Sequence, residues 1–205
     1  MFIGHLSSGY ILGRLLQNHT RNAYPNYGRM IMGAAILGAI APDFDLLYFY
    51  LVDNRQTHHH LYWSHFPVIW TAAFCVALAL HRVLNKKHLT FPALVFCGGG
   101  VVHLLLDSIV GDIYWLAPFG YEPFSLFSVP GGYHPWWLNF ILHWSFFFEV
   151  VITGWAFWCW KYGGGVRWIW GRKALIRSKS CFVRTPDRPG DRAPTGGPIG
   201  NAGTQ

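Results

Sequence analysis

Charged residues are scarce in this sequence. Asp, Glu, Lys and Arg make up 12% of the 205 residues, while 52% are hydrophobic and 18% are aromatic. Soluble domains usually carry about twice this share of charge, roughly 25%. The shortage excludes the surface of an ordinary soluble enzyme and predicts a protein embedded in a lipid bilayer.

Paired cysteines are absent as well. Cys75, Cys97, Cys159 and Cys181 form no CxxC pair, and three of them lie in apolar runs. A free thiol in such a run behaves as a small hydrophobic side chain. The sequence therefore predicts neither a disulfide framework nor a thiolate zinc site.

Positive charge is not in excess before the C-terminus. Through Trp160 there are seven Lys or Arg and seven Asp or Glu, but from Lys161 onward there are nine against two. Residues 163–205 are also rich in Pro and Gly and cannot bury a core. We expect them to form a disordered basic tail that follows a membrane-embedded domain of residues 1–162.

Apolar runs, by contrast, are long and numerous. A spanning helix needs about 20 apolar residues, or somewhat fewer when its neighbours help. Five segments qualify on this basis: residues 2–16, 30–52, 66–80, 92–106 and 136–160. Pro42 is expected to end or kink the second helix. The predicted fold class is all-α, a polytopic membrane helix bundle of about five apolar helices.

The basic residues between these segments predict the topology. With five crossings, the arginines of the first loop, the basic loop at 82–87 and the tail share one side, and only Arg55 lies on the other. Lys and Arg favour the cytoplasmic side of a membrane. We therefore expect an integral inner-membrane protein with a cytoplasmic C-terminus, whose polar groups within 43–65 and 103–107 lie toward the outer face.

Ionisable residues inside the apolar segments are the candidates for chemistry. His103 and Asp107 are four apart on a predicted helix, so their side chains lie on one face. Such a pair is costly in a membrane unless it meets a partner or an ion in the bundle interior. The pair indicates metal ligands, and the alternative is a His–Asp hydrogen bond that only holds helices together.

Asp43 and Asp45 come directly after Pro42, where the helix is expected to break. Across such a break both carboxylates can point into one cavity, and carboxylate oxygens are ligands for hard and borderline cations. The alternative is that Asp43 caps a helix through Phe44–Val52, which would leave Asp45 unexplained.

A histidine cluster follows, at His58, His59, His60 and His65. Neutral imidazole is a preferred ligand of zinc and similar metals. His65 and either His59 or His60 can converge if the segment turns into the next helix. An interfacial set of His, Tyr and Trp residues would instead account for His58. His5, alone on a short apolar helix, is by itself more typical of a buried core histidine.

Together these residues exceed the three protein ligands of a typical mononuclear catalytic zinc. A two-metal site would use them all, as would one metal whose ligands are oriented by further hydrogen-bonding residues. Asp43 and Asp45 are also the candidate catalytic residues, one of them as general base. The predicted metal residues are His5, Asp43, Asp45, His59, His60, His65, His103 and Asp107.

The order of these motifs resembles that of a known family. MFIGHLSSGYIL, GAIAPDFD, HHHLYWSHFP and HLLLD followed by WLAPF are similar to the motifs of the membrane-bound metal-dependent hydrolases, also described as LexA-binding, inner-membrane-associated hydrolases. The resemblance covers roughly residues 1–120. Ser64 stands where that family usually has Thr, and no Arg follows the first histidine of the third motif. By position, the resemblance implies site roles for His5, Asp43, Asp45, His65, His103, Asp107 and one of His59 and His60.

The resemblance implies hydrolysis with one or two divalent ions, of which zinc is favoured. By analogy with all-helical zinc phospholipases and nucleases, the expected substrate is an ester or phosphoester, with a phosphoester of a lipid or lipid-linked molecule preferred. The alternative is a non-enzymatic membrane protein that binds or transports a metal ion or a proton, for which polar groups across the whole membrane depth are expected.

The expected partners follow from the surface. They are the lipid bilayer, a small-molecule or lipid substrate, and a protein bound through the basic tail. Cations directly after a spanning helix are a usual cytoplasmic anchor. Nucleic acid is not expected, because no base-reading or stacking motif accompanies the charge.

Overall fold

The structure is a computed structural model that describes residues 3–135 and 137–162. The regular secondary structure of these residues is helical, apart from one isolated bridge between Ile113 and Phe124. The predicted all-α class is therefore confirmed. The tail predicted at 163–205 lies outside the described residues.

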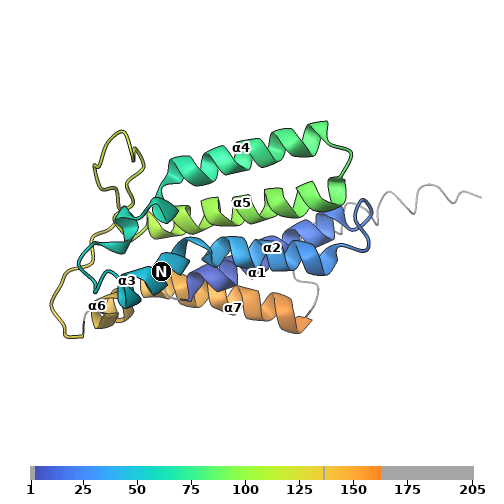
Figure 1. The fold of residues 1–205 in the computed structure, drawn as a ribbon. Helices are drawn as coiled ribbons and strands as arrows, with labels where there is room; N and C mark the ends of the chain where they lie inside the picture. The colour runs from blue at the N-terminus through green and yellow to red at the C-terminus, as the bar shows by residue number, and fades with distance from the viewer. Residues whose placement is uncertain (1–2, 136, 163–205) are drawn as a thin grey trace, which may run out of the picture. The chain divides into compact units, whose positions relative to one another are not determined.

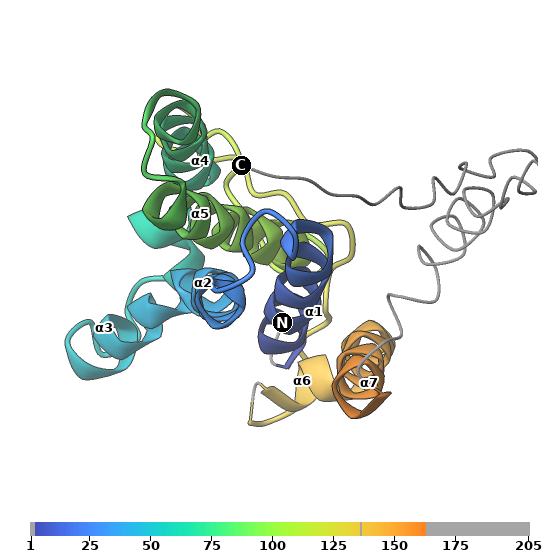
Figure 2. The same ribbon diagram turned by 90° about the vertical axis from the view of Figure 1, so that its right-hand side faces the viewer.

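Five long helices run side by side (Figure 1). They are α1 (Gly4–Thr20), α2 (Gly28–Ile40), α4 (Pro67–Val83), α5 (Lys87–Asp107) and α7 (Phe146–Tyr162). α2 packs against both α1 and α5, α4 packs against α5, and α7 packs against α1 (Figure 2).

Short elements gather at one end of these helices, and they position the candidate site (Figure 1). Three of them are 3-10 turns and two are short α-helices. They are η1 (Pro42–Phe44), α3 (Asp45–Leu51), η2 (His59–Leu61), η3 (Trp63–His65) and α6 (Trp137–Leu142).

Pro42 ends α2, as its sequence position predicts. Ala41, the residue before the proline, nevertheless keeps helical φ and ψ values of −61° and −37°, so the expected loss of helical geometry at that residue is wrong. The break instead fits the missing N–H of Pro42, which cannot continue the helical hydrogen bonding. The chain goes on through η1 and α3 at an angle of 57° to α2. This bend lies where Asp43 and Asp45 emerge.

The segment 136–160 does not form the single helix that its composition suggests. It is divided into α6 and α7 at His143–Ser145. There Nδ1 of His143 lies 2.8 Å from the hydroxyl of Ser145. Local side-chain bonds of this kind compete with helical hydrogen bonding, which a count of apolar residues does not register.

Small residues let the backbones of α1, α2 and α5 approach closely. A Cβ added at Gly38 of α2 would overlap the carbonyl oxygen of Phe96 in α5. One at Gly99 would lie 2.8 Å from the nitrogen of Ala39, and one at Gly9 would lie 2.8 Å from the Cβ of Ala39. Close backbone contact is how membrane helices associate, because lipid supplies no hydrophobic driving force between them.

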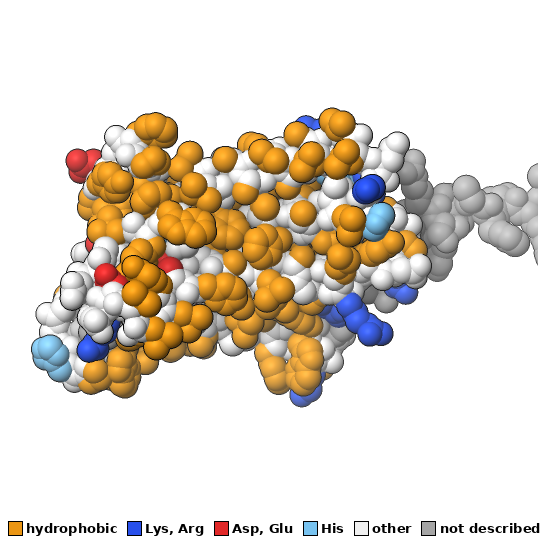
Figure 3. Space-filling view, in the orientation of Figure 1, with side chains coloured by type: hydrophobic (Ala, Val, Ile, Leu, Met, Phe, Trp, Pro, Cys, Tyr) orange, Lys and Arg blue, Asp and Glu red, His pale blue; other side chains and the backbone are white. Residues whose placement is uncertain are grey.

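The outward faces of the helices are apolar. Exposed large side chains include Val76, Leu80 and Val83 on α4 and Phe157 and Trp160 on α7. Most of the visible Lys and Arg side chains lie at the end opposite the short elements, while Asp and Glu lie at the end with them (Figure 3). The positive-inside tendency concerns the Lys and Arg side chains alone, and which end of the molecule faces the cytoplasm stays a prediction.

Helix length alone identifies fewer spans than the five predicted. Among the described residues, α5 is long and apolar enough to cross a membrane, and α2 with its bent continuation adds a second crossing if the pair counts as one. α1, α4 and α7 have 17 residues each.

Glu149 ties α7 to the start of α1. Its buried carboxylate accepts hydrogen bonds from the backbone N–H groups of Ile3, at 2.7 Å, and Gly4, at 3.2 Å. The first N–H groups of a helix have no helical partner, and a carboxylate satisfies them while it interacts favourably with the helix dipole. The contact fixes the turn that carries His5.

Candidate metal centre

Four side chains that can bind a metal converge at the end of the bundle where the short elements lie. Asp43 comes from η1, His65 from η3, and His103 and Asp107 from the last two turns of α5. One ligand atom from each lies within 4.8 Å of the others. These four residues are called the quartet below.

The spacing of the quartet fits one metal ion. Oδ1 of Asp43 lies 3.6 Å from Nε2 of both His65 and His103. Oδ2 of Asp107 lies 3.0 Å from Nε2 of His103 and 3.9 Å from Nε2 of His65. Tetrahedral ligands that lie about 2.0–2.2 Å from an ion are separated from one another by about 3.3–3.6 Å.

The two Nε2 atoms are buried, and both face the carboxylates of the quartet. Among the described residues, neither the Nε2 of His65 nor that of His103 forms a hydrogen bond. Both side chains are 0% exposed. Because buried polar atoms are nearly always paired, the arrangement fits a divalent cation bound between these nitrogens and the carboxylates.

The other ring nitrogen of His65 and of His103, Nδ1, donates a hydrogen bond to a fixed acceptor. Nδ1 of His65 donates to Oδ2 of Asp45 at 2.6 Å, and Nδ1 of His103 donates to the carbonyl oxygen of Ala39 at 2.8 Å. Because each Nδ1 donates a hydrogen bond, Nε2 is the nitrogen of each ring that is left to bind a metal ion, as in most metal-binding histidines. The Ala39 carbonyl is available because α2 ends at Ile40 and its last carbonyls have no helical partner.

Asp45 and His5 contact the quartet from outside. Oδ2 of Asp45 accepts a hydrogen bond from the hydroxyl of Ser64 at 2.5 Å, in addition to the one from His65. Nε2 of His5 lies 3.0 Å from Oδ1 of Asp107, and the His5 ring stacks on that of His103 with centroids 3.8 Å apart. The sequence predicts both residues for the metal site, and the structure places both in contact with quartet residues. The serine that replaces the usual threonine keeps the hydroxyl that Asp45 needs.

Of the cluster histidines outside the quartet, His60 lies beside Asp107. It is 7% exposed, and its Nε2 lies 3.8 Å from Oδ2 of Asp107. His59 forms a separate group with His60 and His65, in which the ligand atoms again lie within 4.8 Å of one another. His58 is exposed and belongs to neither group.

Charge on the cluster histidines follows from burial and from the carboxylates. Burial lowers the pKa of His59 to about 4 and holds the pKa of His60 well below its usual value, so both rings are neutral at neutral pH. Burial also opposes a charge on His65, but the nearby carboxylates of Asp43 and Asp45 outweigh it and raise the pKa of His65 to about 9.

The quartet opens at Asp43. The side chain of Asp43 is 28% exposed, whereas those of the other three members are 2% exposed or less. Water or a substrate therefore meets this carboxylate before it meets the buried ligands.

Some contributors to the centre carry no recognisable motif. The Ala39 carbonyl is a backbone group, so its position gives no side-chain signal. Gly111, in the loop after α5, makes room for the histidine cluster, since a Cβ there would lie 2.6 Å from the ring of His60. An isolated glycine in a loop predicts a turn and does not by itself reveal such an approach.

Away from the quartet the long helices offer few polar groups. Between His88 and His103, α5 has no acidic or basic side chain. α2 has none after Arg29. A route for protons or metal ions through the bundle would need polar groups along this stretch.

A family model described as "YdjM inner membrane protein" matches residues 1–175. The match includes every residue of the quartet and all of the described helices. No curated protein and no solved structure shows significant similarity to the chain.

Proposed function

Because the chain belongs to the YdjM inner membrane protein family, we propose that it is an integral inner-membrane hydrolase whose quartet holds a divalent metal ion, with zinc as the favoured metal. The substrate class is an ester or phosphoester. The observation that carries the proposal is the convergence of two buried imidazole nitrogens with two carboxylate oxygens. Family membership accounts for the inner-membrane part of the resemblance, while hydrolysis and LexA binding remain predictions.

Five crossings complete the proposed topology, through α1, α2 with its bent continuation, α4, α5 and α7. A helix of 17 residues is about 25 Å long, close to the hydrocarbon thickness of about 30 Å. The basic end of the molecule (Figure 3) would then face the cytoplasm together with the C-terminus. The quartet would lie toward the outer face.

The residues of the centre divide the work of hydrolysis. When bound, a divalent ion lowers the pKa of a water molecule and polarises the ester oxygen that it contacts. His65 and His103 would hold the ion through Nε2, and Asp107 through Oδ2. Asp43 would be a ligand at the open side and, as the exposed carboxylate, would accept the proton of the attacking water.

Two further residues would keep these ligands in place. Asp45 holds the ring of His65 by its Nδ1–H, and His5 holds Asp107 through Oδ1. Partners of this kind fix the ring orientation and raise the basicity of the ligand. They explain why the sequence contains more His and Asp residues than one ion can bind.

Transport of a metal ion or proton is the alternative. Transport would require polar groups along the helices. α2 after Arg29 and α5 between His88 and His103 contain no acidic or basic side chain, so they do not meet this requirement. Binding at one end followed by chemistry there accounts better for the placement of the quartet.

Metal analysis tests the proposal. Purified wild-type protein is expected to contain about one ion per chain at the quartet, and His103→Ala and Asp43→Ala are each expected to contain much less. Hydrolysis of bis(p-nitrophenyl) phosphate by the wild type should depend on the same ion. The site would be refuted if the wild-type protein held no metal, or if neither substitution changed the metal content.

A separate prediction tests which of His59 and His60 contributes to the metal site. His60→Ala is expected to weaken metal binding by roughly 10–100-fold, the effect typical of residues next to a metal ligand, because His60 lies beside Asp107. His59→Ala should have a smaller effect, and His58→Ala is the exposed control with none. Titration against a fluorescent chelator measures all three. A larger loss in His59→Ala than in His60→Ala would reverse the assignment.

Metal affinity is expected to rise with pH up to about 9. His65 is charged below its raised pKa of about 9, so an incoming ion must displace a proton from it. One displaced proton makes the apparent affinity increase about tenfold per pH unit below that pKa. Calorimetry in buffers of different ionisation enthalpy, at pH 7.5, should detect about one proton released per ion. Affinity that is constant between pH 6 and 8 would contradict the charged state of His65.

A further inference from the structure

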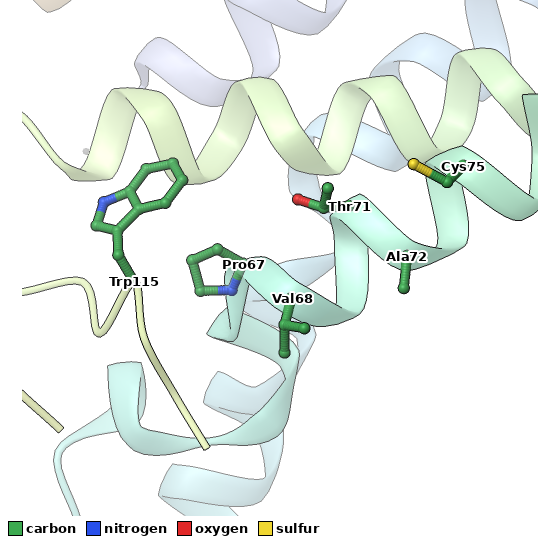
Figure 4. Close-up of a pocket in the computed structure, with 6 residues that line it drawn as sticks. All are labelled: Pro67, Val68, Thr71, Ala72, Cys75 and Trp115. Carbon is green, nitrogen blue, oxygen red and sulfur yellow. The ribbon is translucent and has the colours of Figure 1, made fainter. Parts of the chain in front are cut away.

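An open groove on the outside of α4 has no part in the chemistry described so far. Its volume is about 430 Å³, within the range of small-molecule sites, about 300–1,000 Å³. Trp115 reaches over it from the loop that follows α5, while the other lining residues lie along the first turns of α4 (Figure 4). The groove is lined by Pro67, Val68, Thr71, Ala72, Cys75 and Trp115.

Both walls of the groove begin next to the quartet. Pro67, the first residue of α4, follows His65 by two positions. On the other wall, the indole N–H of Trp115 donates to the hydroxyl of Ser108 at 2.9 Å, and Ser108 directly follows Asp107. One wall of the groove is thus two residues from His65 along the chain, and the other is hydrogen-bonded to the residue that follows Asp107.

Trp70 fixes the position of α4, which lines most of the groove, relative to the quartet. Its indole N–H donates to the carbonyl oxygen of Ser64 at 2.7 Å, and the hydroxyl of Ser64 binds Asp45. The Trp70 ring also lies over Gly100 of α5, where any Cβ would overlap it. The position of α4 relative to the quartet is therefore set by packing and by hydrogen bonds.

The groove is continuous with the lipid-facing surface. α4 has no charged side chain before Arg82, and Val68, Val76 and Leu80 are exposed along it. Beyond Trp115 the loop exposes further apolar side chains, including Phe119, which is 91% exposed. In the topology proposed above this surface meets the bilayer, so an occupant enters from the lipid and is apolar along its length.

We propose that the groove binds the hydrocarbon chain of a lipid phosphoester whose phosphate head lies at the quartet. The substrate class is accordingly a phosphoester with one long linear chain, which enters sideways from the outer leaflet. This inference rests on the proposed metal-dependent function and specifies its substrate.

Photochemical cross-linking tests the groove. The probe is dodecyl phosphate with a diazirine near the end of the chain, added to zinc-loaded protein in phosphatidylcholine nanodiscs. Cross-links are expected to concentrate on residues 67–75 and on Trp115. They should disappear when zinc is removed or when unlabelled dodecyl phosphate is added in excess. The same probe with an alcohol in place of phosphate should label the lipid-facing helices without preference.

A pair of variants supplies the matched control. Ala72→Trp fills the groove, whereas Leu80→Trp adds the same ring on the same helix at an exposed position outside the groove. Ala72→Trp should reduce groove cross-linking by more than about tenfold, since each displaced methylene is worth about a factor of four. Its zinc content should stay at the wild-type level. Leu80→Trp should leave both measurements unchanged.

The outcomes separate the two proposals. Cross-links spread evenly over lipid-facing helices, or unaffected by Ala72→Trp, overturn the chain site. If zinc-dependent hydrolysis of bis(p-nitrophenyl) phosphate, which has no long chain, persists in that case, the proposed function stands and only the groove inference fails. If the protein neither binds zinc nor hydrolyses that ester, the proposed function fails and the substrate assignment fails with it.

Discussion

Replacement of Asp107 by Asn is expected to leave the purified protein without its metal ion. The Asp107 carboxylate is buried and lies at the centre of the site, 3.0 Å from Nε2 of His103 and 3.0 Å from Nε2 of His5. Asn has the same shape but supplies no negative charge to balance a buried cation, which is a large cost in a low-dielectric interior. Since loss of even an orienting residue weakens metal binding by about 10–100-fold, loss of this ligand should exceed about 100-fold. Elemental analysis after dialysis measures it.

A matched substitution lies five residues along the chain. Asp112 is exposed and accepts a hydrogen bond from the hydroxyl of Ser125 at 3.0 Å, away from the quartet. Asp112→Asn should therefore retain the wild-type metal content. A folded Asp107→Asn protein that still holds one ion per chain would place that ion elsewhere, and the group of His59, His60 and His65 would be the next candidate.

The sequence predicts which residues meet, but it does not predict how they share the work. The spacing of His103 and Asp107 already implies a common helix face, and Pro42 implies the break that lets Asp43 turn inward. The division between ligands and orienting residues depends on which ring nitrogen faces which acceptor. For His103 that acceptor is the Ala39 carbonyl, and a backbone group at a helix end leaves no trace in a residue pattern.

The choice between His59 and His60 shows the same limit. A motif spacing of five or six residues fits both, because the chain between them and His65 was expected to turn in an unspecified way. The structure makes two 3-10 turns there, η2 and η3. Their backbone path buries His60 beside Asp107 and leaves His59 farther from the quartet. Short irregular turns have weak sequence signals, so the register could not be set beforehand.

Helix ends were harder to predict than the presence of helices. The apolar run 92–106 predicts α5 except for its first five residues and its last, since α5 spans Lys87–Asp107 and includes polar residues at its start. The run 136–160 contains no proline and reads as continuous, yet the chain breaks at His143–Ser145. In both cases specific hydrogen bonds and contacts decide the boundary, whereas composition reports only the average polarity.

The packing of α2 against α5 also holds the metal site together, because the two helices supply Ala39 and His103. That packing depends on glycines at which a side chain has no room. Substitutions at Gly38 and Gly99 should therefore affect stability and metal binding together.

Replacement of Gly38 by Ala is accordingly expected to destabilise the protein strongly. The added Cβ would overlap the carbonyl oxygen of Phe96, and a backbone group cannot move aside as a flexible side chain can. Overpacking of this kind costs about 1–3 kcal/mol, and more when a backbone must shift. Separation of the helices would also withdraw the Ala39 carbonyl from Nδ1 of His103, so metal affinity should fall as well.

Gly33 of the same helix is the control for Gly38. A Cβ at Gly33 meets nothing within 4 Å, and Ala is a better helix former than Gly by about 0.5–1 kcal/mol. Gly33→Ala should therefore keep or slightly raise the thermal stability of the protein in detergent, with unchanged metal affinity, while Gly38→Ala lowers both. Equal behaviour of the two variants would mean that α2 and α5 are not in backbone contact at Gly38, and the bond from His103 to Ala39 would then lose its structural basis.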